Sequence, residues 1–364
     1  MAVLPATRPP VASMPPVLAA DRCAPLAEVV RGGTVESVHF GAVAVVDRRG
    51  ELIHAAGDPR TLTFTRSALK PLQALPFVAE GGIERFGLSG AQVALLCASH
   101  SGEPTHVAAV GDMLGRCGCT EADLQCGAHA PGHYEALGEV PPPPPYSPLA
   151  HNCSGKHAGM LAYCVQHGHA KADYLAREHP LQRSIRRAVA CFTGVAEERL
   201  VAGIDGCSAP NYAVPLAALA TAFARLATAG VDPDYGDAPR TLANAMVAHP
   251  GMVSGERRSD LALMRAGRGD WVTKIGAEGV QAVGIRSQGL GIAIKVADGH
   301  KRGLYPAIVA VLEQLGLVDA PARAALASWG RQEVRNFRGT VTGEVRPAVV
   351  LRAVRPQIST GTGA

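Results

Sequence analysis

Strand-patterned segments lie near both ends of the chain, and a long helix-patterned stretch separates them. Residues 42–47 and 51–54 flank a short turn and predict a β-hairpin. Residues 280–285 and 290–296 predict a second hairpin near the other end. Between the hairpins, residues 66–270 are rich in alanine and in helical patterns. Terminal strands that share one sheet, with a helix-rich region inserted between them, give an α+β fold.

The same pattern sets the predicted domain boundaries. We expect a flexible, proline-rich tail at residues 1–24 and a short tail at residues 356–364. Residues 25–355 then form one domain, whose sheet comes from about residues 30–60 and 275–352. The chain shows no internal repeat.

Three smaller features refine this prediction. Residues 304–315 have an apolar helical pattern that ends at Gly316. Residues 348–351 are apolar and are expected to form a last strand. The run of five prolines at residues 141–145 predicts a stiff, exposed loop.

The composition is that of a globular protein and excludes several partners. The chain is 47% hydrophobic and 18% charged, which is enough to build a sizeable core. The net charge of +4 comes without a dense basic block, and only 4% of the residues are aromatic. This balance argues against nucleic acid as a partner. No apolar run has the length of a membrane span, so we expect no membrane association.

The cysteines and the first residues predict a cytoplasmic location. The nine cysteines are odd in number and lack the spacing of a disulfide framework, so we expect free thiols in a reducing compartment. The start of the chain is broken by prolines and has no clean apolar stretch of a signal peptide.

Six lysines stand against 29 arginines, which draws attention to each lysine within a motif. The segment RSALKP places Ser67 three residues before Lys70. On a helix, positions i and i+3 lie on one face, so the hydroxyl and the amine can meet. A desolvated lysine can lose its charge and act as a general base beside a nucleophile. The spacing also arises by chance on many helices, so it predicts chemistry only in company with other motifs.

Further segments carry such motifs. The apolar, strand-like run at residues 93–96 is expected to deliver Ser99 and His100 to a cleft. The alternative interpretation is that residues 97–103 form an ordinary strand-to-loop junction. Near the second hairpin, Lys274 lies in a strand-like segment that ends in Lys-x-Gly. Lys-x-Gly follows the serine motifs of penicillin-binding proteins and serine β-lactamases in the same order.

Two segments carry thiols. Residues 152–160 open a helix that ends at Gly168, and Cys153, Lys156 and His157 lie at its start. Thiolate, amine and imidazole at a helix N-terminus can bind a metal or an anionic substrate group. Cys207 lies in a turn and could complete a site with Cys153, although an isolated thiol is more often a small buried apolar side chain.

Taken in order, RSALKP, CASHSGE, HNCSGKHAGM, DGCSAP and KIGAEG resemble the L-asparaginase II family. This is the inducible, metal-containing type known from rhizobia, and the resemblance extends from about residue 29 to residue 343. It implies a fold similar to that of serine β-lactamases and glutaminases, with an asparaginase catalytic domain at residues 25–355. It also implies a homodimer whose substrate is the small molecule L-asparagine. Departures from the family pattern are the polyproline run and the residues before Arg31.

The resemblance also implies a site. Two serine–lysine pairs map onto the positions Ser67 with Lys70 and Ser99 with Lys274. The family's zinc ligands, two cysteines and a lysine, map onto the positions Cys153, Lys156 and Cys207. Residues that line the substrate pocket, with His100 added as a polar contact, are expected at Arg66, His100, His157 and Asp205.

The predicted reaction is hydrolysis of the L-asparagine side-chain amide to L-aspartate and ammonia. Ser67 is expected to attack the carbonyl carbon while Lys70, neutral at the working pH, takes its proton. Ser99 and Lys274 would then relay a proton to the departing ammonia. Zinc would shape the pocket and position the substrate.

Two alternatives remain open. One is a β-lactamase or D-peptidase relative, which the missing signal peptide disfavours. The other is a non-catalytic amino-acid or metal sensor on the same scaffold, which would bind its ligand without releasing ammonia.

Overall fold

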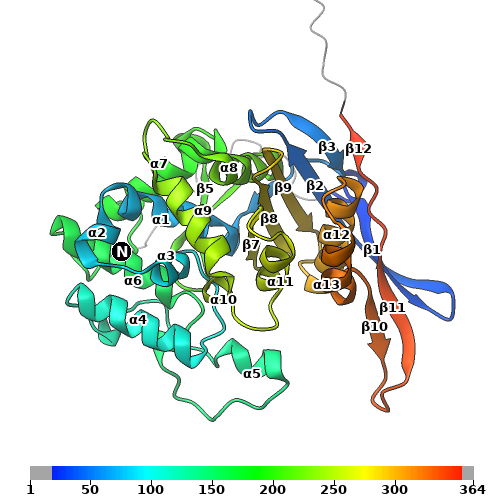
Figure 1. The fold of residues 1–364 in the computed structure, drawn as a ribbon, viewed down its shortest axis with the longest axis horizontal. Helices are drawn as coiled ribbons and strands as arrows, with labels where there is room; N and C mark the ends of the chain where they lie inside the picture. The colour runs from blue at the N-terminus through cyan, green and yellow to red at the C-terminus, as the bar shows by residue number, and fades with distance from the viewer. Residues whose placement is uncertain (1–18, 355–364) are drawn as a thin grey trace, which may run out of the picture.

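A nine-stranded antiparallel sheet joins the two ends of the chain in the computed structural model, which describes residues 19–354. Its main path runs β10-β11-β1-β2-β9-β8-β7, and β3 pairs with both β2 and β12 (Figure 1). The N-terminal strands β1 and β2 lie side by side between two strands from the other end of the chain, β11 and β9. The sheet strands are β1 (Ala24–Arg31), β2 (Thr34–Val46), β3 (Leu52–Ala56), β7 (Trp271–Gly276), β8 (Val280–Ile285), β9 (Leu290–Val296), β10 (Gln332–Arg335), β11 (Val341–Pro347) and β12 (Arg352–Ala353).

The helix-rich region lies between β3 and β7, as the sequence pattern predicts (Figure 1). It also contains a small sheet of order β4-β6-β5. The helices are α1 (Lys70–Ala79), α2 (Gly82–Phe86), α3 (Gly90–Leu96), α4 (Pro104–Arg116), α5 (Gly132–Leu137), α6 (Ser154–His167), α7 (Pro180–Thr193), α8 (Leu216–Thr228), α9 (Ala238–Ala248), α10 (Pro250–Val253) and α11 (Ser259–Ala266). The strands of the small sheet are β4 (Leu62–Phe64), β5 (Val201–Ile204) and β6 (Pro210–Pro215).

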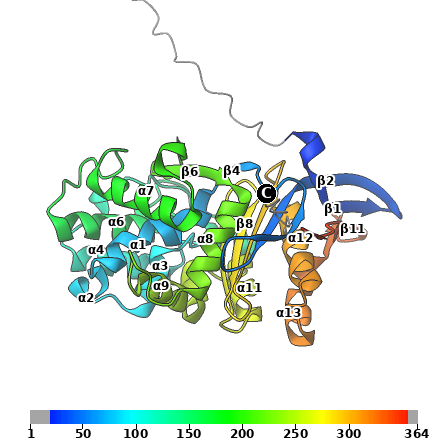
Figure 2. The ribbon, with the colours of Figure 1, turned by 90° about the horizontal axis from the view of Figure 1, so that it is seen from above.

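Alternating side chains on the strands give the large sheet two apolar faces. In β2, Ala42, Ala44 and Val46 belong to the core of the helix-rich region, whereas Val43 and Val45 belong to a second core. This period of two is what a strand buried on both sides requires. Figure 2 shows the sheet between α8 on one face and α12 (Lys301–Gln314), backed by α13 (Ala320–Gly330), on the other. The sheet is therefore the middle layer of the molecule.

Two paired glycines allow α8 to lie directly on the sheet. Gly284 of β8 is opposite Gly291 of β9 in the register. A Cβ at Gly284 would collide with the carbonyl oxygen of Phe223, and one at Gly291 with that of Ala220. Both carbonyls belong to α8, so its backbone occupies the space that two side chains would otherwise fill.

Most of the predicted strands and helices are confirmed, and two are wrong. The run at residues 93–96 is not a strand but the end of α3, which begins at a Ser89–Gln92 capping box. Residues 348–351 are not a strand either. Leu351 N donates to the side chain of Gln314, and Val349 O accepts from it, so α12 takes up hydrogen bonds that a neighbouring strand would supply.

Other predictions on the chain's ends and loops have different outcomes. Of the tail predicted at residues 1–24, residues 1–18 lie outside the described residues. Its last residue, Ala24, is already the first residue of β1. The whole of the tail predicted at residues 356–364 also lies outside the described residues. Pro141–145 form a loop outside helix and strand, with mostly exposed side chains, as expected. Within residues 19–354, no helix combines the length and the apolarity that crossing a bilayer requires.

We predict that Gly291→Ala destabilises the fold, because the new methyl group meets the α8 backbone rather than a movable side chain. Overpacking of this kind costs about 1–3 kcal/mol, and a backbone neighbour places the cost at the upper end. Urea unfolding measures the difference. Gly111→Ala in α4 is the matched control, since its Cβ meets nothing within 4 Å and alanine favours a helix. Equal stability of the two variants would contradict the close packing of α8.

Candidate active site

Arg66 and Asp205 form the entrance side of the site. Arg66 begins a short 3₁₀ turn (Arg66–Leu69) directly after β4, and Asp205 follows β5. Arg66 Nε donates to Asp205 Oδ1 at 2.9 Å, and this charge, together with the backbone N–H of Gly206, keeps the pKa of Asp205 below its usual value despite burial. Asn211 of β6 holds the Arg66 backbone, since its Oδ1 accepts from Arg66 N and its Nδ2 donates to Arg66 O, each at 3.0 Å.

The backbone at Arg66 is held in a rare conformation. Its φ is +48°, a region that non-glycine residues seldom adopt. Strand β7 presses on this turn, because a Cβ at Gly276 would lie 2.8 Å from Thr65 O. Gly276 therefore lets the end of β7, which carries Lys274, approach the turn that carries Ser67. Strained backbone of this kind persists only where its surroundings fix it, often at functional sites.

A cavity of about 330 Å³ opens beside this pair. It is lined by Leu62, Thr63, Phe64, Arg66, Gly203, Ile204, Asp205, Asn211, Glu278 and Lys295. The lining combines both charges with apolar side chains, and the volume lies at the small end of the range for small-molecule sites. The cavity can therefore receive a small zwitterion next to the Arg66–Asp205 pair.

The amine of Lys70 lies at the centre of the buried part of the site. Lys70 is the first residue of α1 and is 1% exposed. Its Nζ is hydrogen-bonded to the carbonyl oxygens of Ala98 and Asn152 and lies 2.9 Å from Ser99 Oγ. A neutral amine in this position would donate to the two carbonyls and accept the Ser99 proton. Lys70 therefore contacts the Ser99 hydroxyl, which the family resemblance pairs with Lys274.

Lys274 is buried beside Asp260 instead. Its Nζ donates to Ile275 O at 2.8 Å and lies 3.4 Å from Asp260 Oδ2. Burial, with the charge of Lys70 adding to it, lowers the pKa of Lys274 to about 8, although Asp260 opposes the shift. Within residues 19–354 no hydrogen bond joins Lys274 to Ser99. The predicted Ser99–Lys274 pair is therefore not formed directly.

Asp260 is a functional candidate that the sequence did not reveal. It is fully buried at the start of α11 and accepts hydrogen bonds from Thr273 Oγ1 at 3.0 Å, Ile275 N at 2.9 Å and Gln281 Nε2 at 3.1 Å. These hydrogen bonds tie α11 to β7 and β8 and fix the strand around Lys274. No motif marks it, because it reaches β7 only through tertiary folding.

Ser67 is the more accessible of the two serines. Its side chain is half-buried, and no hydrogen bond of its hydroxyl occurs within the described part of the chain. Ser99, by contrast, is 4% exposed, and its backbone N–H donates to Val253 O at 2.8 Å. Ser67 lies one residue after Arg66, so of the two hydroxyls it is the one next to the cavity-lining pair.

The predicted metal ligands meet in one buried group. Lys156 Nζ donates to Cys207 Sγ at 3.0 Å. A hydrogen bond from the Cys207 thiol and the charges of Lys70 and Lys156 hold the pKa of Cys153 well below its usual value. Burial lowers the pKa of Lys156, but the charges of Cys207 and Cys153 outweigh it, so the pKa is raised. Without metal, the group is therefore an ammonium beside a thiolate.

The donor types of this group fit zinc. Two thiolates and one nitrogen leave a fourth tetrahedral position open. Among residues 19–354, no set of three or more His, Cys, Asp or Glu side chains is arranged to hold a metal, so a zinc site here requires Lys156 as its third ligand. Lys156 must then lose its proton when metal binds.

The two histidines predicted in the pocket lie differently from each other. His157 is fully buried, its Nδ1 contacts Tyr174 Oη at 2.6 Å, and its Nε2 has no partner within the described residues. Burial lowers the pKa of His157 to about 4, so its ring is neutral. His100 is also buried, but both of its nitrogens are engaged, with Gly102 N at 3.1 Å and Ser154 Oγ at 2.9 Å. His100 thus links the Ser99 loop to α6 and has no nitrogen free for a substrate.

A comparison of the sequence with protein-family models assigns the chain. The model described as L-asparaginase II matches residues 27–347. The chain belongs to the L-asparaginase II family. Membership of this family implies an L-asparaginase, a hydrolase of a linear amide bond. The resemblance seen in the five motifs is therefore confirmed.

Solved structures with a related arrangement are distant in sequence. The native form of Mglu is 16% identical, with a TM-score of 0.44 and coverage of 77% of this chain and 66% of Mglu. A β-lactamase from Mycobacterium bovis is 17% identical, with a TM-score of 0.36 and coverage of 80% of this chain and 95% of the β-lactamase. The chain thus spans slightly less than two thirds of Mglu. No curated protein matches the chain.

Proposed function

We propose that this protein hydrolyses the side-chain amide of L-asparagine to L-aspartate and ammonia through its serine–lysine cluster. The observation that carries the proposal is the contact of Lys70 Nζ with Ser99 Oγ at 2.9 Å, one helical turn from Ser67. In this proposal the contact supplies the base and the relay hydroxyl, while Ser67, three residues before Lys70 and beside the cavity-lining Arg66, supplies the half-buried nucleophile. Family membership supports the substrate class.

The charged pair at the cavity supports recognition of an amino acid. Arg66 offers a guanidinium for an α-carboxylate, and Asp205 offers a carboxylate for an α-ammonium group. The side chains of the pair are 27% and 12% exposed, respectively, so both are accessible from the cavity yet partly shielded from water. A substrate bound there directs its side chain towards the half-buried Ser67.

The proposed reaction moves one proton in and out of the cluster. Ser67 Oγ attacks the amide carbon while Lys70 takes the hydroxyl proton, which leaves a tetrahedral oxyanion. Lys70 then returns the proton, with Ser99 Oγ as the relay, to the leaving nitrogen, so that ammonia departs and an ester to Ser67 remains. Lys70 then takes a proton from a water molecule whose oxygen attacks the ester carbon. The proton returns to Ser67 Oγ as L-aspartate leaves. While Lys70 carries the proton, a neutral Lys274 avoids a second positive charge in the buried cluster.

We further propose that Cys153, Lys156 and Cys207 hold zinc. A zinc ion would supply positive charge and a fixed point that shapes the pocket, while the proton transfers stay with the serines and lysines. Its contacts would replace the hydrogen bond from Lys156 Nζ to Cys207 Sγ at 3.0 Å. A homodimer and a cytoplasmic location remain proposals that rest on the family resemblance and on the cysteine usage.

We predict measurable ammonia release from L-asparagine, and more than from L-glutamine or D-asparagine assayed in parallel. Ser67→Ala should lower kcat by about 10⁴-fold or more, since the nucleophile is lost, and should abolish the acyl adduct seen by mass spectrometry after rapid quenching. Ser99→Ala should cost about 10²- to 10³-fold and retain the adduct, because only the relay is lost. Ser37→Ala on the exposed part of β2 is the control.

Two outcomes would contradict this assignment. An adduct that persists in Ser67→Ala and disappears in Ser99→Ala would make Ser99 the nucleophile. Stoichiometric binding of L-asparagine without ammonia release would favour the sensor, and turnover of nitrocefin in its place would favour the β-lactamase alternative.

We predict that kcat rises with pH through about 8, because Lys274 is charged below that value and neutral above it. Asp260→Asn removes the negative charge that raises the pKa of Lys274, so the rise should move to lower pH. Asp237→Asn, at an exposed pair with Arg240, should leave the profile unchanged. A pH profile of kcat that is the same in wild type and in folded Asp260→Asn would refute the role of neutral Lys274.

We predict about one zinc ion per chain by elemental analysis of the purified protein. Cys153→Ser and Cys207→Ser should each lose most of it, since each removes a thiolate ligand, whereas Cys191→Ser, outside the group, should retain it. Zinc retained in both ligand variants, or absent from wild type with full activity, would rule out this site.

A further inference from the structure

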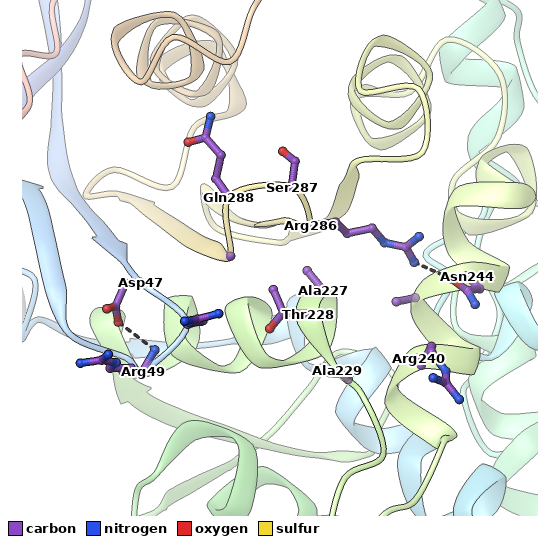
Figure 3. A pocket seen from close by; sticks show the side chains of 13 residues that line it. Asp47, Arg49, Ala227, Thr228, Ala229, Arg240, Asn244, Arg286, Ser287 and Gln288 are labelled. Atoms are coloured by element: carbon purple, nitrogen blue, oxygen red, sulfur yellow. Dashed lines mark hydrogen bonds between the residues drawn. The ribbon is translucent and has the colours of Figure 1, made fainter.

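A large pocket lies away from the active site, where two hairpin turns meet helices α8 and α9. Its volume is about 680 Å³, within the range of small-molecule sites. Figure 3 shows Asp47 and Arg49 on one side of it and Arg240, Asn244 and Arg286 on the other. The lining residues are Asp47, Arg48, Arg49, Ala227, Thr228, Ala229, Arg240, Ala243, Asn244, Arg286, Ser287, Gln288 and Gly289.

The lining is strongly positive. It contains four arginines and one acidic residue, Asp47. The Asp47 carboxylate is occupied by its own turn, because Oδ1 accepts from Arg49 N at 2.8 Å and from Glu51 N at 3.0 Å. Of the four guanidinium groups, that of Arg240 pairs with Asp237. The other three have no carboxylate within 4.0 Å among residues 19–354.

Arg286 has donors that the protein leaves unsatisfied. Its NH2 group donates to Asn244 Oδ1 at 2.8 Å, as the dashed line in Figure 3 marks. Its Nε is buried and has no hydrogen-bond partner within the described residues. Burial lowers the pKa of Arg286, since its charge is poorly hydrated. The NH1 group of Arg286 has no hydrogen-bond partner among the described residues and is not buried, so it is the donor that an oxyanion in the pocket can reach.

The turns that carry the arginines are fixed in place. Ser287 donates to Asp270 through both N, at 2.7 Å, and Oγ, at 2.9 Å. Gly289 has a φ of +64°, and a Cβ there would lie 3.3 Å from Arg48 Cβ, so the two turns pack closely. Because the backbone of these turns is already ordered, binding an anion costs less backbone freedom, which favours affinity.

We propose that this pocket binds a small molecule with at least two phosphate groups. Guanidinium groups bind phosphate oxygens through paired hydrogen bonds, and arginines on opposite sides of one pocket suit a ligand with charge at both ends. L-Asparagine does not fit this chemistry, because its ammonium group would meet arginines and the one carboxylate is already occupied. The site is therefore separate from the proposed amidohydrolase function and does not depend on it.

Titration calorimetry of the full chain with pyrophosphate tests the proposal. We expect saturable binding of one pyrophosphate per chain and at least about a tenfold loss of affinity in Arg48→Ala and in Arg286→Ala. Arg31→Ala, at an exposed arginine paired with Glu36 on a distant hairpin, should bind as wild type does. Because Arg48 lies outside the catalytic cluster, ammonia release by Arg48→Ala should equal that of wild type.

Three results would overturn the proposal. The first is no saturable binding of pyrophosphate at millimolar concentration. The second is unchanged affinity in both Arg48→Ala and Arg286→Ala. If Arg286→Ala does not fold, unchanged affinity in Arg48→Ala alone is sufficient, because Arg48 is exposed and its replacement leaves the fold intact. The third is equal affinity for citrate at matched ionic strength, since this would show recognition of charge alone.

Discussion

The buried amine of Lys70 holds together three segments that are far apart in the sequence. It starts α1, and its hydrogen bonds reach Ala98 and Ser99 after α3 and Asn152 before α6. Without these oxygen partners a charged or neutral amine at 1% exposure would be strongly destabilising. The same contacts that stabilise the buried amine therefore bring the Ser99 hydroxyl to it, so that folding and the assembly of the catalytic group are one event.

The two other buried lysines of the site also have polar partners that stabilise the buried amine. Lys274 lies beside the carboxylate of Asp260, and Lys156 beside the Cys153 thiolate and the Cys207 sulfur. The net shifts differ, because burial outweighs Asp260 and lowers the pKa of Lys274 to about 8, whereas the neighbouring Cys207 and Cys153 outweigh burial and raise the pKa of Lys156. Lys274 can therefore lose its proton near pH 8, while Lys156 stays charged until a metal displaces its proton.

The sequence predicted what local patterns determine. The hairpin at β8 and β9 and the helix α6 with Gly168 as its stop were predicted because apolar runs flanking a turn and a glycine at a helix end are local signals. The run at residues 93–96 was too short to distinguish helix from strand, and its capping box decided it. The candidate residues were found from motifs, but the contact of Lys70 with Ser99 and the part played by Asp260 depend on segments that meet only in the folded chain.

The central claim is that a neutral lysine operates inside this cluster, and NMR of the lysine side chains tests it most directly. The chain has six lysines, so ¹³Cε resonances can be assigned one by one and titrated. We predict that one resonance titrates near pH 8 and is absent from Lys274→Met, while that of Lys171, whose pKa is raised by its hydrogen bond to Asp123, titrates at higher pH. A Lys274 resonance that titrates above about 10 would contradict the account.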